Sequence, residues 1–234
     1  MTEGRRRPGF DLVSALTLGE APSAPDDRPD ARTRLLVAAE RLIIRSGYEA
    51  ATTRRIASEA QAHVGQVAYY FGSLPGLFRT LADDNLALML GGRTRLLEGA
   101  RSMDEGEDKG EGDPLDRFLD AYLRPVFFAS AHCRDMPASV VVRELISHSE
   151  GTQRDEIIRR INENIELSHR HLAALLPHAD AWALHLRLRL ITGAAVYLMP
   201  TIDELGLFDF GLGVPAGQDP YRQLLIAARG VMLA

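Results

Sequence analysis

Residues 52–71 read TTRRIASEAQAHVGQVAYYF, and this segment contains the most specific structural pattern in the chain. Its apolar side chains Ile56, Ala57, Ala60 and Val67 recur at helical spacing on the two sides of a short polar turn. Two short helices joined in this way bury one face of each against the other, and a small residue such as Ala57 permits the close crossing. The pattern predicts a helix-turn-helix, whose second helix enters the major groove of DNA.

Helical spacing continues on both sides of this segment and predicts an all-α fold. One helix is expected before it, from Ala31 until Gly47 ends it, and a long one after it, from Ser73 toward Leu97. Later helices are expected where a Ser, Thr, Asp or Pro precedes an apolar periodic run. One of them begins at residue 114, and four others cover residues 138–148, 152–176, 180–199 and 219–234. No segment alternates as a strand would, so we expect about nine helices.

Composition shifts divide the chain into three expected parts. Residues 1–30 contain Pro, Gly and mixed charges and are predicted to be a flexible N-terminal arm. Residues 31–80 form the predicted helix-turn-helix DNA-binding domain, and residues 81–234 a helical effector-binding and dimerisation domain. Within the second domain, the acidic, Gly-rich residues 102–113 are expected to form a flexible loop.

Charge and composition exclude several classes of protein. With 46% hydrophobic and 25% charged residues in 234, the chain is globular rather than disordered or rod-like. Its single cysteine, Cys133, forms no intramolecular disulfide, which favours a cytoplasmic location. No run approaches the ~18 apolar residues of a membrane span, so no membrane partner is expected. The net charge is −5, yet residues 32–80 contain seven Arg and three Glu, as a DNA-reading module on an acidic body would.

Two short motifs carry a resemblance to a known family. The residues TTRRIASEA (52–60) and GQVAYYFGS (65–73), with Ala38-Ala39 and Gly47-Tyr48 upstream, resemble the TetR family of bacterial repressors. The resemblance covers about residues 31–80. It implies a homodimer that binds a pseudo-palindromic double-stranded DNA operator and a small-molecule effector. We therefore expect a DNA-binding transcriptional regulator, a repressor that a small apolar or amphipathic effector releases from its operator.

Four positions depart from the family pattern, which usually has Gly, Ser, Lys and Lys where this chain has Gln61, His63, Val64 and Leu74. Gln61 would be strained if its φ were positive, and His63 is a weaker helix cap than a hydroxyl residue. Leu74 replaces a residue whose family role is a phosphate contact. These departures leave open an alternative, a helical dimeric ligand-binding protein that has lost DNA binding.

The candidate DNA contacts lie on the two short helices of the motif. Arg55 and Gln66 are the best candidates for base edges, because Arg pairs with guanine and Gln with adenine. Hydroxyl and imidazole side chains donate to phosphates, which fixes register without reading sequence. The full set is Thr52, Thr53, Arg54, Arg55, His63, Val64, Gln66, Tyr69 and Tyr70.

Two further sites are expected in the C-terminal part. Arg124-Pro125 places a proline in a helical run, and the resulting kink would open space for an effector. The candidate ligand-binding residues are Tyr122, Phe127, Phe128, Arg143, His148 and His169. The last two helices are apolar on much of their circumference and need partners, and the resemblance implies dimerisation there. The candidate interface residues are Trp182, Leu186, Leu190, Tyr197, Leu224 and Leu225.

Nothing in the sequence favours an enzyme. His169 and His171 lie two apart and so face different sides of a helix, unlike a pair of metal ligands. Ser73 in GSLPG is misplaced for a nucleophile elbow. We therefore expect no metal, no cofactor and no catalytic residues.

Overall fold

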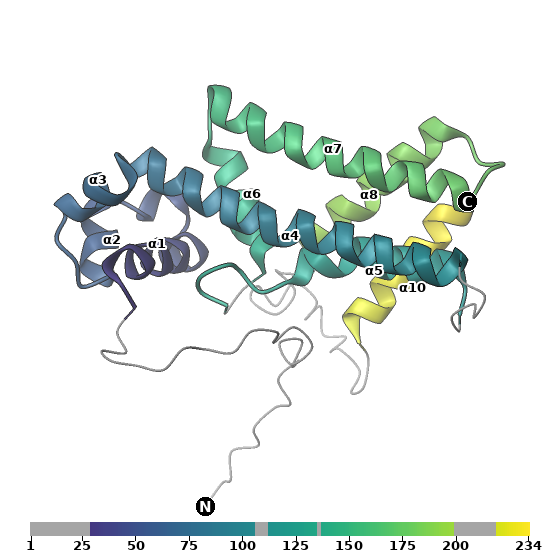
Figure 1. Ribbon diagram of the computed structural model, residues 1–234, viewed down its shortest axis with the longest axis horizontal. Helices are drawn as coiled ribbons and strands as arrows, with labels where there is room; N and C mark the ends of the chain where they lie inside the picture. Colours follow the sequence, from purple (N-terminus) through teal and green to yellow (C-terminus); the bar gives the residue numbers. More distant parts are fainter. Residues whose placement is uncertain (1–28, 106–111, 135–136, 199–218) are drawn as a thin grey trace, which may run out of the picture.

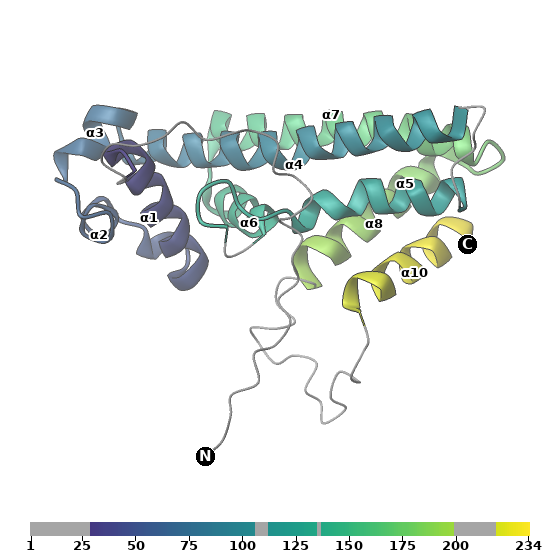
Figure 2. The ribbon, with the colours of Figure 1, turned by 60° about the horizontal axis from the view of Figure 1, so that its bottom comes forward.

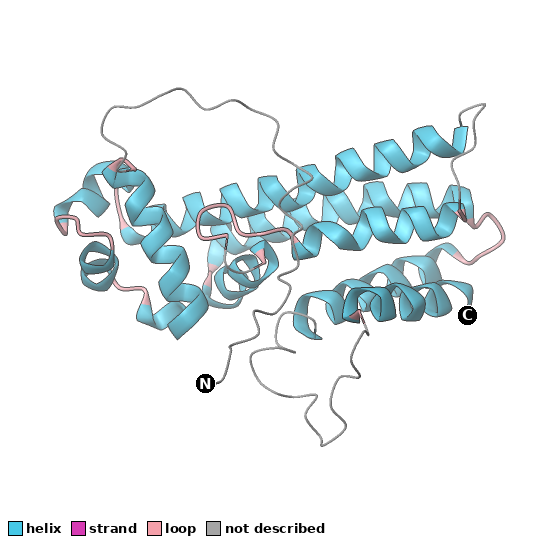
Figure 3. Cartoon of the chain, turned by 90° about the horizontal axis from the view of Figure 1, so that it is seen from below, coloured by secondary structure: helices cyan, strands magenta, loops and turns pink. Residues whose placement is uncertain are grey.

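The computed structural model describes residues 29–105, 112–134, 137–198 and 219–234. In these residues the chain forms nine α-helices and two 3₁₀ turns. The described residues are drawn as helices joined by loops (Figure 3), and their one β feature is an isolated bridge between Ala129 and Pro137. The predicted all-α fold is confirmed. The predicted N-terminal arm lies almost entirely outside the described residues, as does part of the predicted loop.

Three helices form a head at one end of the molecule: α1 (Ala31–Ser46), α2 (Thr53–Glu59) and α3 (Gly65–Phe71) (Figure 1). The Asp30 carboxylate caps α1 by accepting a hydrogen bond from the Thr33 amide at 2.6 Å. Gly47, with φ +81°, ends α1 in a conformation that favours glycine, and the 3₁₀ turn η1 (Tyr48–Ala50) leads into α2. The predicted boundaries of this region therefore hold to within about two residues.

The long helix α4 (Leu74–Glu105) leaves the head and runs the length of the body (Figures 1 and 2). At about 1.5 Å per residue, its 32 residues span about 48 Å. The domain boundary predicted at residue 80 falls inside this continuous helix. The helix also extends through residues 102–105, which were expected to belong to a loop. An ion pair between Asp104 and Arg117 of the following helix anchors its last turn.

The body consists of α4 with α5 (Pro114–Leu123), α6 (Ala138–His148), α7 (Gly151–Leu175), α8 (Ala181–Leu198) and α10 (Pro220–Leu233) (Figure 2). Asp113 and Asp219 cap α5 and α10, each from the position before a proline. The sequence placed the starts of these two helices at residues 114 and 219. None of the described helices is both long and apolar enough to cross a bilayer.

The expected kink at Pro125 takes a different form. Helix α5 ends at Leu123, and the chain continues as a 3₁₀ turn, η2 (Arg124–Phe127). Proline has no N–H to donate to the carbonyl four residues earlier, so an α-helix cannot continue regularly through it. The tighter turn is closed by the Phe128 amide, which donates to the Pro125 carbonyl at 3.2 Å.

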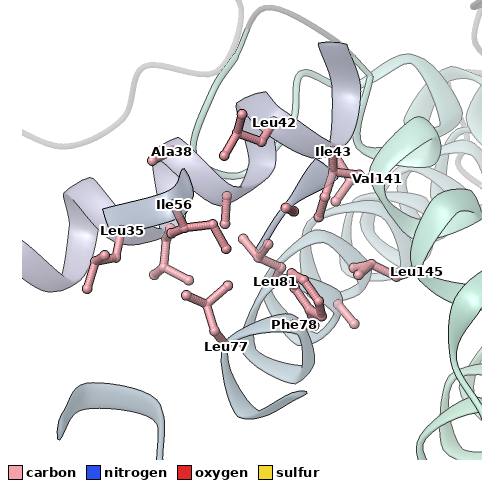
Figure 4. Packing of buried hydrophobic residues seen from close by; sticks show 14 of the residues in the cluster. Leu35, Ala38, Leu42, Ile43, Ile56, Leu77, Phe78, Leu81, Val141 and Leu145 are labelled. Atoms are coloured by element: carbon pink, nitrogen blue, oxygen red, sulfur yellow. The ribbon is translucent and has the colours of Figure 1, made fainter. Parts of the chain in front are cut away.

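One hydrophobic cluster joins the head to the body (Figure 4). Leu35 and Ile43 of α1 and Ile56 of α2 pack with residues of α4, while Val141 and Leu145 enter the same cluster from α6. All five side chains are at most 1% exposed. Because close-packed interiors transmit displacements, a shift of α4 or α6 reaches α1 directly.

Candidate DNA interface and cavity of the body

The turn between α2 and α3 is strained at Gln61, because the φ angle of this residue is positive. Gln61 has φ +51°, in the left-handed region that favours glycine. The turn is closed by the Ala62 amide, which donates to the Ala57 carbonyl at 2.9 Å. A non-glycine residue in this region costs about 1–2 kcal/mol, which the packing of Ala57 and Ala60 in the head offsets.

Gln66 has a structural role that the sequence pattern did not bring to notice. Its side-chain oxygen accepts a hydrogen bond from the His63 amide at 3.1 Å, and its own amide donates to the His63 carbonyl at 2.9 Å. This is the glutamine half of a capping box at the start of α3. The spacing of three residues between His63 and Gln66 is the signal that could have revealed it. The NH₂ group of Gln66 is left as a donor for a base edge.

The outer face of α3 presents aromatic side chains to solvent. Tyr69 is 80% exposed and contacts Tyr70 edge to face, with ring centroids 4.9 Å apart. Phe71 instead packs against the head cluster, and the Arg32 guanidinium lies 5.5 Å from its ring centroid. The two tyrosines are therefore free to reach DNA, while Phe71 holds α3 in place.

The remaining predicted DNA contacts lie at the first turns of α2 and α3. The Thr52 hydroxyl caps α2 by accepting from the Arg55 amide at 3.4 Å. The other side chains here are exposed or half-buried: Thr53, Arg54, Arg55, His63 and Val64. The structure thus brings all nine predicted residues to the α2–α3 end of the head, away from the body (Figure 1).

Burial makes the surface of the head more positive than its residue count. Glu40 is fully buried, and Glu59 lies 3.6 Å from Arg41 in an ion pair. Burial therefore removes one acidic charge, that of Glu40, from the outer field of the head, whereas the Arg41–Glu59 pair cancels one charge of each sign. Leu74 is half-buried against the head cluster, and its apolar side chain has no donor for a phosphate.

The body contains a cavity of about 200 Å³ that is lined by residues of α4, η2, α6, α7 and α8. The polar residues of its lining are Arg93, Ser139, Arg143 and Thr192, and Gly193 also lines it. The apolar residues of its lining are Met89, Leu90, Val126, Val142, Ile146, Ile161 and Val196. A broader depression of about 610 Å³ follows the outer face of α7, but none of its lining residues is buried. Among the described residues, no three His, Cys, Asp or Glu side chains gather as a metal site would require.

Arg93 is the most unusual residue of the cavity. It is 2% exposed, and its guanidinium donates from Nε to the Tyr122 carbonyl at 2.9 Å and from Nη1 to Asn164 Oδ1 at 3.0 Å. It also lies over the Tyr122 ring, 4.3 Å from the centroid. Burial lowers the pKa of this guanidinium below its ordinary value. The sequence pattern did not single out Arg93, because an arginine between polar neighbours is typical of a solvated helix face.

Two of the six predicted ligand-binding residues lie at the cavity. Arg143 lines it directly. Tyr122 is fully buried beneath Arg93, and its hydroxyl lies 2.6 Å from the hydroxyl of Thr192, which lines the cavity.

The other four predicted residues contact different parts of the structure. The ring of Phe127 packs on Tyr221 at 5.3 Å between centroids, and Phe128 packs against Gly92. His148 stacks on Tyr48 of the head, while His169 Nε2 lies 2.9 Å from the Ala181 carbonyl. Their participation in ligand binding stays a prediction that the cavity geometry does not support.

Of the six residues predicted at the dimer interface, three are exposed on the surface of the single chain. Trp182, Leu186 and Leu190 follow one exposed stripe of α8, being 72%, 41% and 57% exposed, and Ile226 of α10 is 57% exposed. We call these four residues the α8–α10 surface. Leu224 and Leu225 are half-buried against the body core, and the side chain of Tyr197 lies outside the described part of the structure. Helices α8 and α10 pack against each other at the end of the body far from the head (Figure 2).

Comparisons with known proteins agree with this geometry. Residues 35–81 match the domain of the bacterial regulatory proteins of the tetR family. The solved TetR family transcriptional regulator PfmR from Thermus thermophilus is similar with a TM-score of 0.60 at 16% identity, over 86% of this chain and 98% of that one. A transcriptional regulator from Rhodococcus sp. Rha1 gives a TM-score of 0.53 at 17% identity, over 86% and 93%. No curated protein matches the chain. The head therefore matches the domain of the tetR family of bacterial regulatory proteins, and the helical body shares the fold of solved members of that family.

Proposed function

We propose that this transcriptional regulator is a repressor that binds a pseudo-palindromic DNA operator as a homodimer and is released by a small molecule bound in the body cavity. The observation that carries the DNA-binding part is the outer face of α3. There Tyr69 is 80% exposed on a rigid helix whose first turn is capped by Gln66. An exposed tyrosine on a positively charged head offers its hydroxyl as a hydrogen-bond donor to DNA phosphates.

The homodimer is supported by the α8–α10 surface. Trp182, Leu186 and Leu190 recur every four residues on one helix face, which is a continuous apolar stripe rather than scattered exposure. Pairing this surface with a second copy covers the stripe and places two heads on one particle. Two recognition helices about 34–36 Å apart then read half-sites one helical turn apart.

Release by an effector is supported by the position of the cavity. On α6, Val141 belongs to the head cluster, and the adjacent residues Val142 and Arg143 line the cavity. On α4, Met89 belongs to the head cluster and also lines the cavity. A ligand that displaces α4 or α6 therefore changes the packing under α1. For release, the ligand must bind the DNA-incompetent arrangement more tightly, because equal affinity shifts nothing.

The proposal is tested by fluorescence anisotropy with a labelled duplex from the region upstream of the protein's own gene. The expected result is saturable binding that a scrambled duplex of equal length does not reproduce at about 150 mM salt. Tyr69→Ala is expected to weaken it, whereas Met103→Ala, on an exposed site of α4, leaves it unchanged. A folded, dimeric protein that binds no duplex even at low salt would instead favour the ligand-binding protein without DNA binding.

A further inference from the structure

The lining of the body cavity includes a buried positive charge without an acidic partner in the described part of the chain. Arg93 is fixed by a backbone carbonyl, the Asn164 amide oxygen and the face of the Tyr122 ring, all of them neutral. Among the described residues no carboxylate lies within ion-pair distance of Arg93. A buried cation compensated only by neutral dipoles is unfavourable, and an anion beside it is strongly favoured.

A second polar group in the lining of the cavity also has no partner within the described ranges. The Ser139 hydroxyl is 1% exposed and has no hydrogen-bond partner among the described residues. Buried hydroxyl groups are nearly always paired in folded proteins, so this one indicates a missing acceptor or donor. Ser139 lines the cavity together with Arg93 and with Arg143, whose Nη2 lies 3.3 Å from Glu144 Oε1 in an ion pair. The Arg93 guanidinium, which has no acidic partner among the residues described, and the Ser139 hydroxyl form a donor set suited to an anion.

The rest of the wall is apolar and the cavity is small. Side chains from α4, η2, α6, α7 and α8 line it with carbon, so the part of a ligand beyond the charged group is a hydrocarbon. The volume of about 200 Å³ is below the ~300–1,000 Å³ typical of sites for drug-sized ligands. A compact molecule fits these dimensions, and a long acyl chain or a polycyclic drug does not.

We infer that the effector of this regulator is a small amphipathic organic acid, whose carboxylate lies between Arg93 and Ser139 and whose apolar tail fills the remaining cavity. This inference rests on the proposed effector control and names the chemical class of the ligand. A neutral molecule of the same shape leaves the Arg93 charge uncompensated, and a cationic one is repelled by Arg93.

Binding is measured by isothermal titration calorimetry on the purified full chain without DNA. The probes are hexanoate, hexan-1-ol and hexylamine, which share a tail and differ in charge. Hexanoate is expected to bind at least 10-fold more tightly than hexan-1-ol, and hexylamine not at all. Affinity is expected to rise about fourfold per added methylene from butanoate upward and to stop rising once the cavity is full.

Three variants locate the site. Arg93→Met removes the buried charge and is expected to abolish the preference for hexanoate over hexan-1-ol. Arg95→Met, an exposed arginine two residues along the same helix, is the matched control and is expected to keep it. Ser139→Ala removes only a hydroxyl and is expected to weaken hexanoate 3- to 10-fold without loss of folded protein.

Several outcomes would overturn the inference. They are equal affinity of the wild-type protein for hexanoate and hexan-1-ol, binding of none of the probes at millimolar concentration, or identical behaviour of Arg93→Met and Arg95→Met. If circular dichroism shows that Arg93→Met is unfolded, the wild-type comparison and Ser139→Ala decide the result. Because no DNA is present, failure here is distinct from failure to bind an operator, which the anisotropy experiment reports.

Discussion

The Oε2 atom of Glu40 accepts a hydrogen bond from the Ser130 hydroxyl at 2.9 Å, although 90 residues separate the two in sequence. The same oxygen accepts from the amides of His132, at 3.0 Å, and Cys133. The Asn85 side chain donates to Oε1 at 2.7 Å. Glu40 lies on α1, and residues 130–133 lie between η2 and α6, so one buried carboxylate fastens a segment of the body to the head.

Removing this carboxylate is expected to destabilise the protein strongly. Glu40→Ala leaves at least three donors in a part-buried site without an acceptor. We expect a loss of about 3 kcal/mol in the free energy of unfolding, because each orphaned buried group costs about 1–3 kcal/mol and water satisfies some of them. Urea unfolding followed by circular dichroism measures it. Glu49→Ala, nine residues away and exposed, is the matched control and is expected to change stability by less than about 0.5 kcal/mol. Equal losses in the two variants would show that the contacts of Glu40 contribute nothing.

Base reading and helix capping by Gln66 can be separated with one substitution. Gln66→Glu keeps an oxygen acceptor for the His63 amide, and glutamate is the other residue of a capping box. It also puts a negative charge at the first turn of α3, facing the expected DNA. We expect unchanged thermal stability together with a loss of operator binding of about 1–3 kcal/mol, measured by anisotropy. Retained operator affinity would remove Gln66 from the interface.

Arg55→Ala tests the other candidate for base reading. The Arg55 side chain is exposed at the first turn of α2, and its backbone amide, not its guanidinium, makes the Thr52 cap. Its removal is therefore expected to leave folding intact and to reduce specific operator binding by about 1–3 kcal/mol. A loss that is equal for operator and scrambled duplexes would assign Arg55 to a phosphate contact instead.

Local sequence rules predicted the helices because the features that start and stop them are local. The Asp-Pro pairs at α5 and α10, and the glycine after α1, need no knowledge of distant residues. The same rules misplaced the end of α4, which depends on an ion pair to Arg117 of α5. They also could not reveal Arg93, whose burial arises from the crossing of α4 with α5 and α7. The opposite error occurred at Phe127 and Phe128, whose aromatic character led to the prediction that they line a cavity. In the structure Phe127 contacts Tyr221 and Phe128 contacts Gly92.

Filling the cavity is expected to block the effector without disturbing the fold. A side chain added at Gly193 meets nothing within 4 Å, and Gly193 lines the cavity. Gly193→Leu is therefore expected to abolish hexanoate binding while operator affinity stays within about twofold of wild type. The substitution also adds up to about 1 kcal/mol of stability by helix propensity. Gly99→Leu, at an exposed helical glycine of α4 with equal space, controls for that gain. Undiminished hexanoate binding in Gly193→Leu would place the ligand elsewhere.

The α8–α10 surface is expected to hold two copies together, and a charge placed in it is expected to separate them. Leu190 is 57% exposed in the single chain, so Leu190→Glu leaves a folded protomer. In a dimer the same carboxylate is buried without a partner, at a cost of about 3 kcal/mol or more, which raises the dimer Kd about 100-fold or more.

Sedimentation at micromolar concentration should therefore give a dimer for the wild type and a monomer for Leu190→Glu. Met103→Glu serves as the control, because Met103 is 54% exposed but lies on α4, outside this surface. The monomer should also lose operator affinity although its head is unchanged, because the second half-site contact becomes a separate binding event. A wild type that sediments as a monomer, or a Leu190→Glu variant as dimeric as wild type, would show that these helices do not form the dimer contact.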